Sequence, residues 1–169
     1  MSAPPTPYPN APQGTPRFSA ILPAPFGALG IIADADHLHE IVFLPGNTAA
    51  LQASSIPAEK AVRQLAHYLA DPDYRFDLPL AERGSHFRRR TWAAIGAIPR
   101  GQTRTYSQLA ESLGSVARAV GQACGDNPFP IVTPCHRVVS ASGIGGFAHH
   151  AGGFLIDTKR WLLQHEGAI

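Results

Sequence analysis

The sequence predicts an α/β chain with a strand-containing first half and a mainly helical second half. Three observations predict this class: two β-rich runs within residues 28–44, an amphipathic pattern after Pro57, and a helix-turn-helix pattern in residues 105–125. The chain has 169 residues, 44% of them hydrophobic, which is enough for two small domains with a real core. We expect domains at residues 18–84 and 85–169.

Residues 1–17 hold six prolines and few large apolar side chains, which predicts a flexible tail. The β-rich runs 28–32 and 40–44 flank a polar turn and are typical of a hairpin. After Pro57, apolar residues recur at i, i+1, i+4, i+7 and i+8, so we expect an amphipathic helix that ends near Asp71. Residues 76–80 then predict an extended linker that docks on the core.

The second half is expected to open with a helix that Ser85 caps and that stops at Pro99. Thr105 and Gln108 have capping-box spacing, and Gly114 with Ser115 supplies the turn of a helix-turn-helix. We expect the core side of its second helix, residues 116–124, to consist of Val116, Val120 and Ala123. Residues 140–153 hold five glycines and predict a loop. A last helix is expected from near Asp157 to Gly167.

The other side chains of the second helix are unusually small. Ala117, Ala119 and Gly121 surround a single long basic residue, Arg118. Small side chains let a helix approach a DNA groove, but they also allow tight packing between helices. The helix carries few side chains that can reach base edges, so DNA binding here would have little sequence preference.

The charge distribution separates the two halves. Residues 85–169 carry nine basic and four acidic side chains, which suggests a polyanion partner, although ordinary surface charge is the common cause of such asymmetry. No apolar run approaches the roughly 20 residues of a membrane span. The N-terminus has prolines where a secretory signal would have an apolar stretch, so the expected compartment is the cytoplasm.

Residues 127–139 hold the clearest candidate for chemistry. Three prolines stiffen the segment before Cys135, which should therefore be extended and deliver the thiol to a set place. His136 and Arg137 are residue types that lower a cysteine pKa. Neighbours on an extended segment point to opposite faces, so one of the two should act through the loop or a bridging water. The alternative is that Cys135 is simply a small buried apolar residue.

The string Pro-Cys-His-Arg-Val, preceded by Asn127-Pro128, resembles the active-site signature of the O6-alkylguanine-DNA alkyltransferases, the methylated-DNA–protein-cysteine methyltransferases. The resemblance covers roughly residues 19–167. It implies an N-terminal α/β domain of ribonuclease-H-like topology and a C-terminal domain with the helix-turn-helix and active site. It further implies irreversible transfer of an alkyl group from O6 of guanine, or from O4 of thymine, to Cys135, once per molecule.

The resemblance also implies roles for individual residues. Glu166 should orient His136, which takes the thiol proton through water, while Tyr106 helps to extrude the nucleotide and donates a proton to the base. Arg118 should take the place of the extruded nucleotide, and we expect Asn127 to brace the turn at Cys135. Further expected DNA contacts are Thr105, Ala117, Ala119, Gly121 and Arg137. The expected substrate pocket comprises Pro130, Val138 and Phe147.

The expected partner is double-stranded DNA carrying O6-alkylguanine, bound by a monomer that associates with the nucleoid and not with a membrane. No cofactor is expected, because the damaged base is itself the alkyl donor. No metal is expected either: the zinc ligands of some relatives have no counterpart, since Cys124 and Cys135 are the only cysteines. His37 and His39 are expected in a solvated turn. A single disulfide between the two cysteines would stabilise a chain of this size only slightly.

Two other classes of function remain open. A lesion sensor of the alkyltransferase-like type would keep the helix-turn-helix but lack the nucleophile that Cys135 provides. A cysteine hydrolase would use Cys135 and His136, but it would turn over repeatedly and need no DNA-binding helix.

Overall fold

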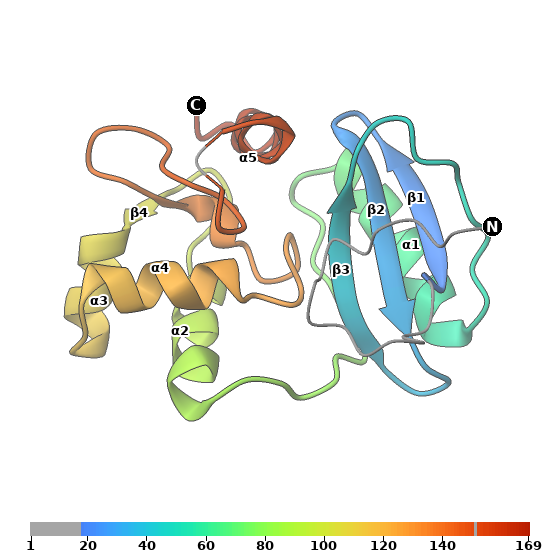
Figure 1. Ribbon diagram of the computed structural model, residues 1–169, viewed down its shortest axis with the longest axis horizontal. Coiled ribbons are helices and arrows are strands. Elements are labelled where there is room, and N and C mark those ends of the chain that lie inside the picture. The colour runs from blue at the N-terminus through green and yellow to red at the C-terminus, as the bar shows by residue number, and fades with distance from the viewer. Residues whose placement is uncertain (1–17, 151) are drawn as a thin grey trace.

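A three-stranded antiparallel sheet forms the first half of the protein in the computed structural model, which describes residues 18–150 and 152–169. Its strands are β1 (Ala20–Ala24), β2 (Gly27–Ala33) and β3 (Leu38–Leu44), in that order (Figure 1). The predicted hairpin is the β2–β3 pair, whereas β1 was not predicted. Pro23 interrupts the strand pattern of residues 20–24 in the sequence. Proline is tolerated there because β1 is an edge strand. The expected N-terminal tail lies outside the described residues.

Helix α1 (Ile56–Ala70) packs against this sheet, as predicted. Ser55 accepts a hydrogen bond from the backbone N–H of Ala58 and so caps the helix. The inner face of α1 packs in one cluster with Leu29, Ile31 and Ile41 of the sheet; its buried members include Ala58, Ala61, Leu65 and Tyr68. The predicted linker also docks on the core: Leu38 N–H donates to Pro79 O at 2.8 Å.

The second half contains the predicted helix-turn-helix. After α2 (His86–Gly96), helices α3 (Tyr106–Leu113) and α4 (Ala117–Gly125) pack together around a turn at Gly114, whose φ is 63°. The capping box is confirmed: Gln108 N–H donates to Thr105 Oγ1 at 3.1 Å, and Thr105 N–H donates to Gln108 Oε1 at 2.9 Å.

The prediction for Val116 was wrong. It precedes α4 as the N-cap residue and is 65% exposed, because its backbone is extended and its side chain does not share the helical face of Val120 and Ala123. Those two residues are buried, as predicted.

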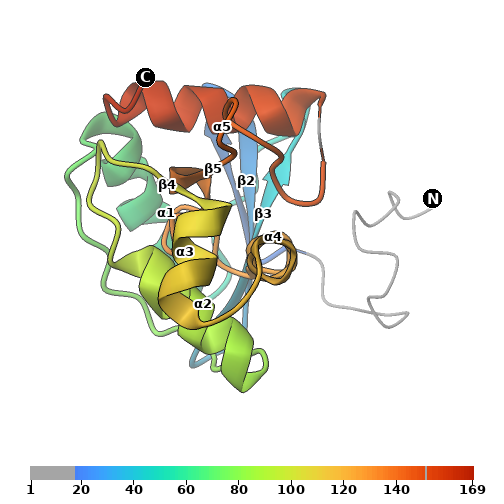
Figure 2. The ribbon, with the colours of Figure 1, turned by 90° about the vertical axis from the view of Figure 1, so that its left-hand side faces the viewer.

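Helix α5 (Phe154–His165) begins three residues before the predicted start, after Gly153 at φ 80°. It runs along one edge of the molecule, past the ends of the sheet (Figure 2). Its buried Leu162 belongs to the core of the N-terminal sheet, and Trp161 contacts Phe26 with ring centroids 5.2 Å apart. Helix α5 therefore ties the second half of the chain to the first. Nowhere in the described ranges is a helix both long and apolar enough to span a bilayer.

The segment before Cys135 is anchored on both halves. Ile41 N–H of β3 donates to Pro128 O at 2.9 Å, and Phe129 and Ile131 are buried in the core around the sheet. On the other side of Cys135, β5 (Val138–Val139) pairs in parallel with β4 (Arg104–Thr105), immediately before α3. The candidate nucleophile thus lies between two fixed points of the fold.

Candidate active site and nucleic-acid interface

Asn127 organises the turn that carries Cys135, as expected. Its Oδ1 accepts from Phe129 N–H at 2.9 Å, and its Nδ2 donates to Thr133 O at 2.8 Å. The same Nδ2 lies 3.2 Å from Cys135 Sγ. One side chain therefore fixes the backbone of the turn and also contacts the sulfur.

Ile131 holds a conformation that is rare for a β-branched residue. Its φ is 74°, in the left-handed region, and its side chain is only 3% exposed. The strain persists because the core around the sheet holds the side chain. Strained backbone of this kind is typical of functional sites, where surrounding structure over-determines the geometry.

The segment before Cys135 is a turn and not the extended run that the prolines predicted, because Thr133 N–H donates back to Phe129 O at 2.8 Å. Cys135 itself begins a short 3₁₀ turn, η1 (Cys135–Arg137). Within that turn, Cys135 and His136 are both buried, and Arg137 is mostly so. The turn lets His136 and Arg137 reach the same partner, so the expectation that they face opposite sides was wrong.

That partner is Glu166, at the end of α5. Its Oε1 lies 2.9 Å from His136 Nε2, in a contact whose geometry is not that of a well-aligned hydrogen bond. Arg137 donates from Nε to Oε1 at 2.9 Å and from Nη2 to Oε2 at 2.8 Å. Burial alone would raise the pKa of Glu166, but the bonds from Arg137 and His136 outweigh it and hold that pKa well below its usual value. Glu166 is therefore a buried anion.

The expected DNA contact of Arg137 needs correction. Besides its two bonds to Glu166, its guanidinium donates from Nη1 to Ile98 O at 2.7 Å. The side chain is 13% exposed. Because its donors point inward, Arg137 compensates Glu166 and is not directed at DNA.

The thiol of Cys135 is protonated at neutral pH. Burial raises its pKa well above the ordinary value, and the nearby Cys124 thiol adds to the increase. The groups that favour the thiolate are Asn127 and Lys159, not His136 and Arg137 as the sequence predicted. Burial also lowers the pKa of His136, so its imidazole is neutral and can accept a proton. Both cysteines are free thiols.

Cys135 borders a cavity of about 350 Å³, within the size range of small-molecule sites. Tyr106 and Phe147 also line it, as do Gly121, Cys124, Gly125, Ser140 and residues 145–150. Pro130 and Val138, expected in the pocket, do not line it. Val138 is 0% exposed, since its strand pairs with β4 and its side chain packs in the core around Ile95. Phe147 borders the cavity as expected.

The glycine-rich loop closes one side of this cavity. His149 lies against Gly125 at the end of α4, and its Nε2 is 3.0 Å from Asp126 Oδ1. A side chain at position 125 would overlap the His149 ring. His149 thus attaches this part of the loop to the helix-turn-helix.

Lys159 is a site residue that was not predicted from the sequence. Its ammonium is buried and donates from Nζ to Val138 O at 2.7 Å and to Gly146 O at 2.9 Å. Nζ lies 5.9 Å from the ring centroids of both Tyr106 and Phe147. Burial lowers the pKa of Lys159 to about 8. A signal was present: Lys159 shares the inner face of α5 with Leu162, Leu163 and Glu166.

The expected DNA contacts on α4 lie at the surface. Arg118 is exposed, Ala117 and Ala119 are half-buried, and a Cβ added to Gly121 would meet no atom within 4 Å. This face is therefore not covered by another helix, which removes the alternative of tight helix packing at Gly121. Thr105 is half-buried, and its hydroxyl caps α3.

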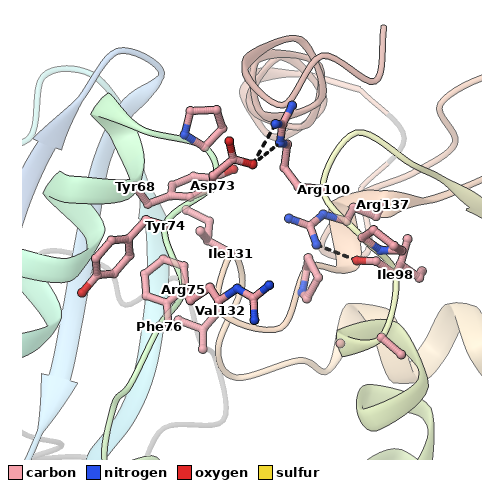
Figure 3. Close-up of a pocket in the computed structure, with 15 residues that line it drawn as sticks. Tyr68, Asp73, Tyr74, Arg75, Phe76, Ile98, Arg100, Ile131, Val132 and Arg137 are labelled. Carbon is pink, nitrogen blue, oxygen red and sulfur yellow. Dashed lines mark hydrogen bonds and ion pairs between the residues drawn. The ribbon is translucent and has the colours of Figure 1, made fainter.

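A second cavity, of about 650 Å³, lies between the two halves of the chain and shares no lining residue with the first. Tyr68 and residues 72–76 line one side, and Ile98, Arg100 and Arg137 line the other (Figure 3). Arg137 therefore borders the second cavity and not the first. Within residues 18–150 and 152–169, no three His, Cys, Asp or Glu side chains gather to hold a metal ion.

The comparisons with known proteins agree on one family. Residues 86–168 match the model of the DNA-binding domain of 6-O-methylguanine DNA methyltransferase. A solved Mycobacterium tuberculosis O6-methylguanine methyltransferase superposes with a TM-score of 0.71 at 34% identity, covering 88% of this chain and 91% of that one. The M. tuberculosis OGT in complex with DNA gives a TM-score of 0.71 at 37% identity, with the same coverage.

Two curated relatives share the name methylated-DNA–protein-cysteine methyltransferase. A methylated-DNA–protein-cysteine methyltransferase of Mycolicibacterium paratuberculosis is 48% identical over 63% of this chain, and the match spans 63% of that relative's length. One of Methanosarcina acetivorans is 35% identical over 89% of this chain and 99% of its own length. Because this similarity extends over nearly the whole of both sequences, the chain belongs to the methylated-DNA–protein-cysteine methyltransferase family.

Proposed function

We propose that this protein repairs DNA by moving an alkyl group from O6 of guanine onto Cys135, once per molecule. The observation that carries the proposal is the position of the Cys135 thiol. It borders a cavity beside Tyr106 and Phe147, and Asn127 Nδ2 lies 3.2 Å from its sulfur. The names of the relatives, methylated-DNA–protein-cysteine methyltransferases, support this reaction.

The proposed chemistry uses side chains of this chain, the damaged base and one bridging water. His136 accepts the thiol proton, through a water, at Nδ1, which is buried and has no protein partner among the described residues. The sulfur attacks the alkyl carbon, the carbon–oxygen bond breaks, and its electron pair passes to guanine O6. Tyr106 supplies a proton to the departing base; burial raises its pKa to about 12, so the phenol is protonated beforehand.

The product is a thioether, and this explains the single turnover. An alkyl sulfide is a poor leaving group, so water cannot restore the thiol. His136 gains one proton and Tyr106 loses one. The proton on His136 therefore replaces the one that Tyr106 donates, and no net proton is gained or lost. Guanine is regenerated, and Cys135 stays alkylated.

DNA reaches this site by way of α4. We propose that α4 enters the minor groove with its small face, and that the damaged nucleotide is extruded into the cavity beside Cys135. Arg118, exposed on the same helix, then occupies the space that the nucleotide leaves. Residues 85–169 form the DNA-binding and transfer domain in this account. One chain supplies Cys135, His136, Glu166 and Asn127, so we propose a monomer that acts on the chromosome.

One assay separates this proposal from a lesion sensor and from a cysteine hydrolase. Duplex DNA labelled on the O6-methyl group of guanine is incubated with the protein and with a Cys135→Ala variant. Label retained on wild-type protein and absent from the variant supports transfer. Binding without any label would indicate a sensor, and neither binding nor label would point to a hydrolase.

A further inference from the structure

The carboxylate of Glu166 is held from the N-terminal half of the chain as well as by Arg137. The Tyr68 hydroxyl donates to Glu166 Oε2 at 2.7 Å, and both residues are buried. Tyr68 belongs to α1 and lies across the interdomain cavity from Arg137 (Figure 3). The two residues therefore reach the same carboxylate from different domains.

Arg100 links the backbone of Glu166 to Asp73 in the N-terminal half. Arg100 donates from Nη1 to Glu166 O at 3.0 Å and from Nε to Asp73 Oδ1 at 2.7 Å. The His165 ring, one residue earlier, contacts Tyr68 O at 2.8 Å. The end of α5 is thus attached to residues 68–73 at both the main chain and the side chain.

The contacts of the two carboxylate oxygens differ. Oε1 faces His136 and Arg137, whereas Oε2 faces Arg137 and Tyr68. Without the Tyr68 hydroxyl, Oε2 of the fully buried Glu166 loses a donor, and the carboxylate gains freedom to turn away from His136. Burial and the charge of Glu166 raise the pKa of Tyr68, so the hydroxyl keeps its proton and remains a donor.

We propose that Tyr68 is a positioning residue for alkyl transfer: it aims Glu166 at His136, so the N-terminal half of the chain completes the catalytic relay. This inference rests on the proposed function. Tyr68 is buried and does not border the Cys135 cavity, so its effect should be confined to the chemical step.

The test uses the full-length protein and free O6-benzylguanine, which reports the reaction without DNA binding. Tyr68→Phe removes one hydroxyl and keeps the ring packed against Phe76 and His165. We expect the maximal rate of Cys135 alkylation to fall roughly tenfold, the scale of one charge-assisted hydrogen bond, with an unchanged half-saturating concentration. Tyr74→Phe is the matched control, because Tyr74 stacks on His67 and its hydroxyl makes no hydrogen bond within the described residues.

A double-mutant cycle then separates positioning from general packing. In a Glu166→Gln background the anion is gone, so adding Tyr68→Phe should slow the reaction no further. Equal slowing in both backgrounds, or a Tyr68→Phe rate equal to that of wild type, would overturn the inference. A wild-type protein that is not alkylated at all would instead overturn the proposed function.

Proton NMR of the wild-type protein tests the Tyr68–Glu166 contact even if the Tyr68→Phe variant fails to fold. A hydroxyl proton buried against a carboxylate exchanges slowly and resonates downfield. We expect such a signal from Tyr68 and its loss in Glu166→Gln. Its absence from the wild-type spectrum would remove the contact on which the inference depends.

Discussion

Arg137 and Glu166 form a two-point contact, with Nε to Oε1 at 2.9 Å and Nη2 to Oε2 at 2.8 Å. The contact compensates a buried anion at the C-terminal end of α5, where the helix dipole alone would disfavour a carboxylate. His136 meets the same carboxylate at 2.9 Å. One buried charge therefore organises the residues that follow Cys135.

Removing the guanidinium should destabilise the fold. Arg137→Ala leaves Glu166 buried without its principal partner, and breaking a buried ion pair in this way costs about 3–5 kcal/mol. Urea unfolding at neutral pH measures the loss. Arg160→Ala, an exposed arginine on α5, is the control and should change the free energy of unfolding by less than about 0.5 kcal/mol. Equal stabilities for the two variants would contradict the role of Arg137.

Asn127→Ala should make the thiol harder to ionise. The hydrogen bond from Asn127 Nδ2 favours the thiolate and lowers the pKa of Cys135, against the larger effect of burial. Its loss should move the pH of half-maximal Cys135 alkylation upward, as read from the rate with O6-benzylguanine across a pH series. Asn47→Ala, at an exposed turn, should leave the profile in place. A downward shift for Asn127→Ala would refute the contact.

Lys159 should give the fold a characteristic dependence on pH. Its pKa is about 8 in the folded protein against 10.5 ordinarily, so the unfolded chain binds more protons between these values. Stability should therefore rise with pH in that window, by roughly 3 kcal/mol for this residue alone. Lys159→Met should lack this contribution. The free energy of unfolding of the wild type should therefore increase with pH relative to that of the variant. Lys60→Met, on α1, is the control, and its free energy of unfolding should change with pH as that of the wild type does. If the wild type and Lys159→Met showed the same pH dependence, the buried charge of Lys159 would be contradicted.

A bulky side chain at position 121 should weaken DNA binding without harming the fold. Gly121 lies in α4 with open space around its Cα, and leucine favours a helix over glycine by roughly 0.8 kcal/mol. Gly121→Leu should keep or raise the melting temperature yet reduce affinity for duplex DNA at least tenfold in a fluorescence anisotropy titration. Gly96→Leu, at an equally open position at the end of α2, serves as the matched control. Unchanged DNA affinity for Gly121→Leu would place α4 away from the groove.

Local patterns allowed much of the fold to be predicted. Thr105 and Gln108 satisfy each other's backbone within a few residues, so the capping box is visible in sequence. The helical period of α1 and the proline-bounded string at Cys135 are likewise local. Val116 was misplaced because one residue decides whether a helix has started, and element ends are the least determined feature of a sequence.

The contacts at Glu166 could not be predicted in the same way. Arg137 and Glu166 are 29 residues apart, and Tyr68 is 98 residues from Glu166. Their meeting depends on how α1 and α5 pack, which no local pattern specifies. The thiol pKa was misjudged for the same reason: charged sequence neighbours suggested a lowered value, whereas burial raises it.

Mass spectrometry after titration with O6-methylguanine DNA shows whether Cys135 accepts a single alkyl group. With lesions in excess, we expect one added methyl group per protein molecule, located on the Cys135 peptide, with Cys124 unmodified and the surplus lesions intact. Loss of more than one lesion per molecule, or methyl groups on Cys124 with Cys135 free, would contradict this expectation.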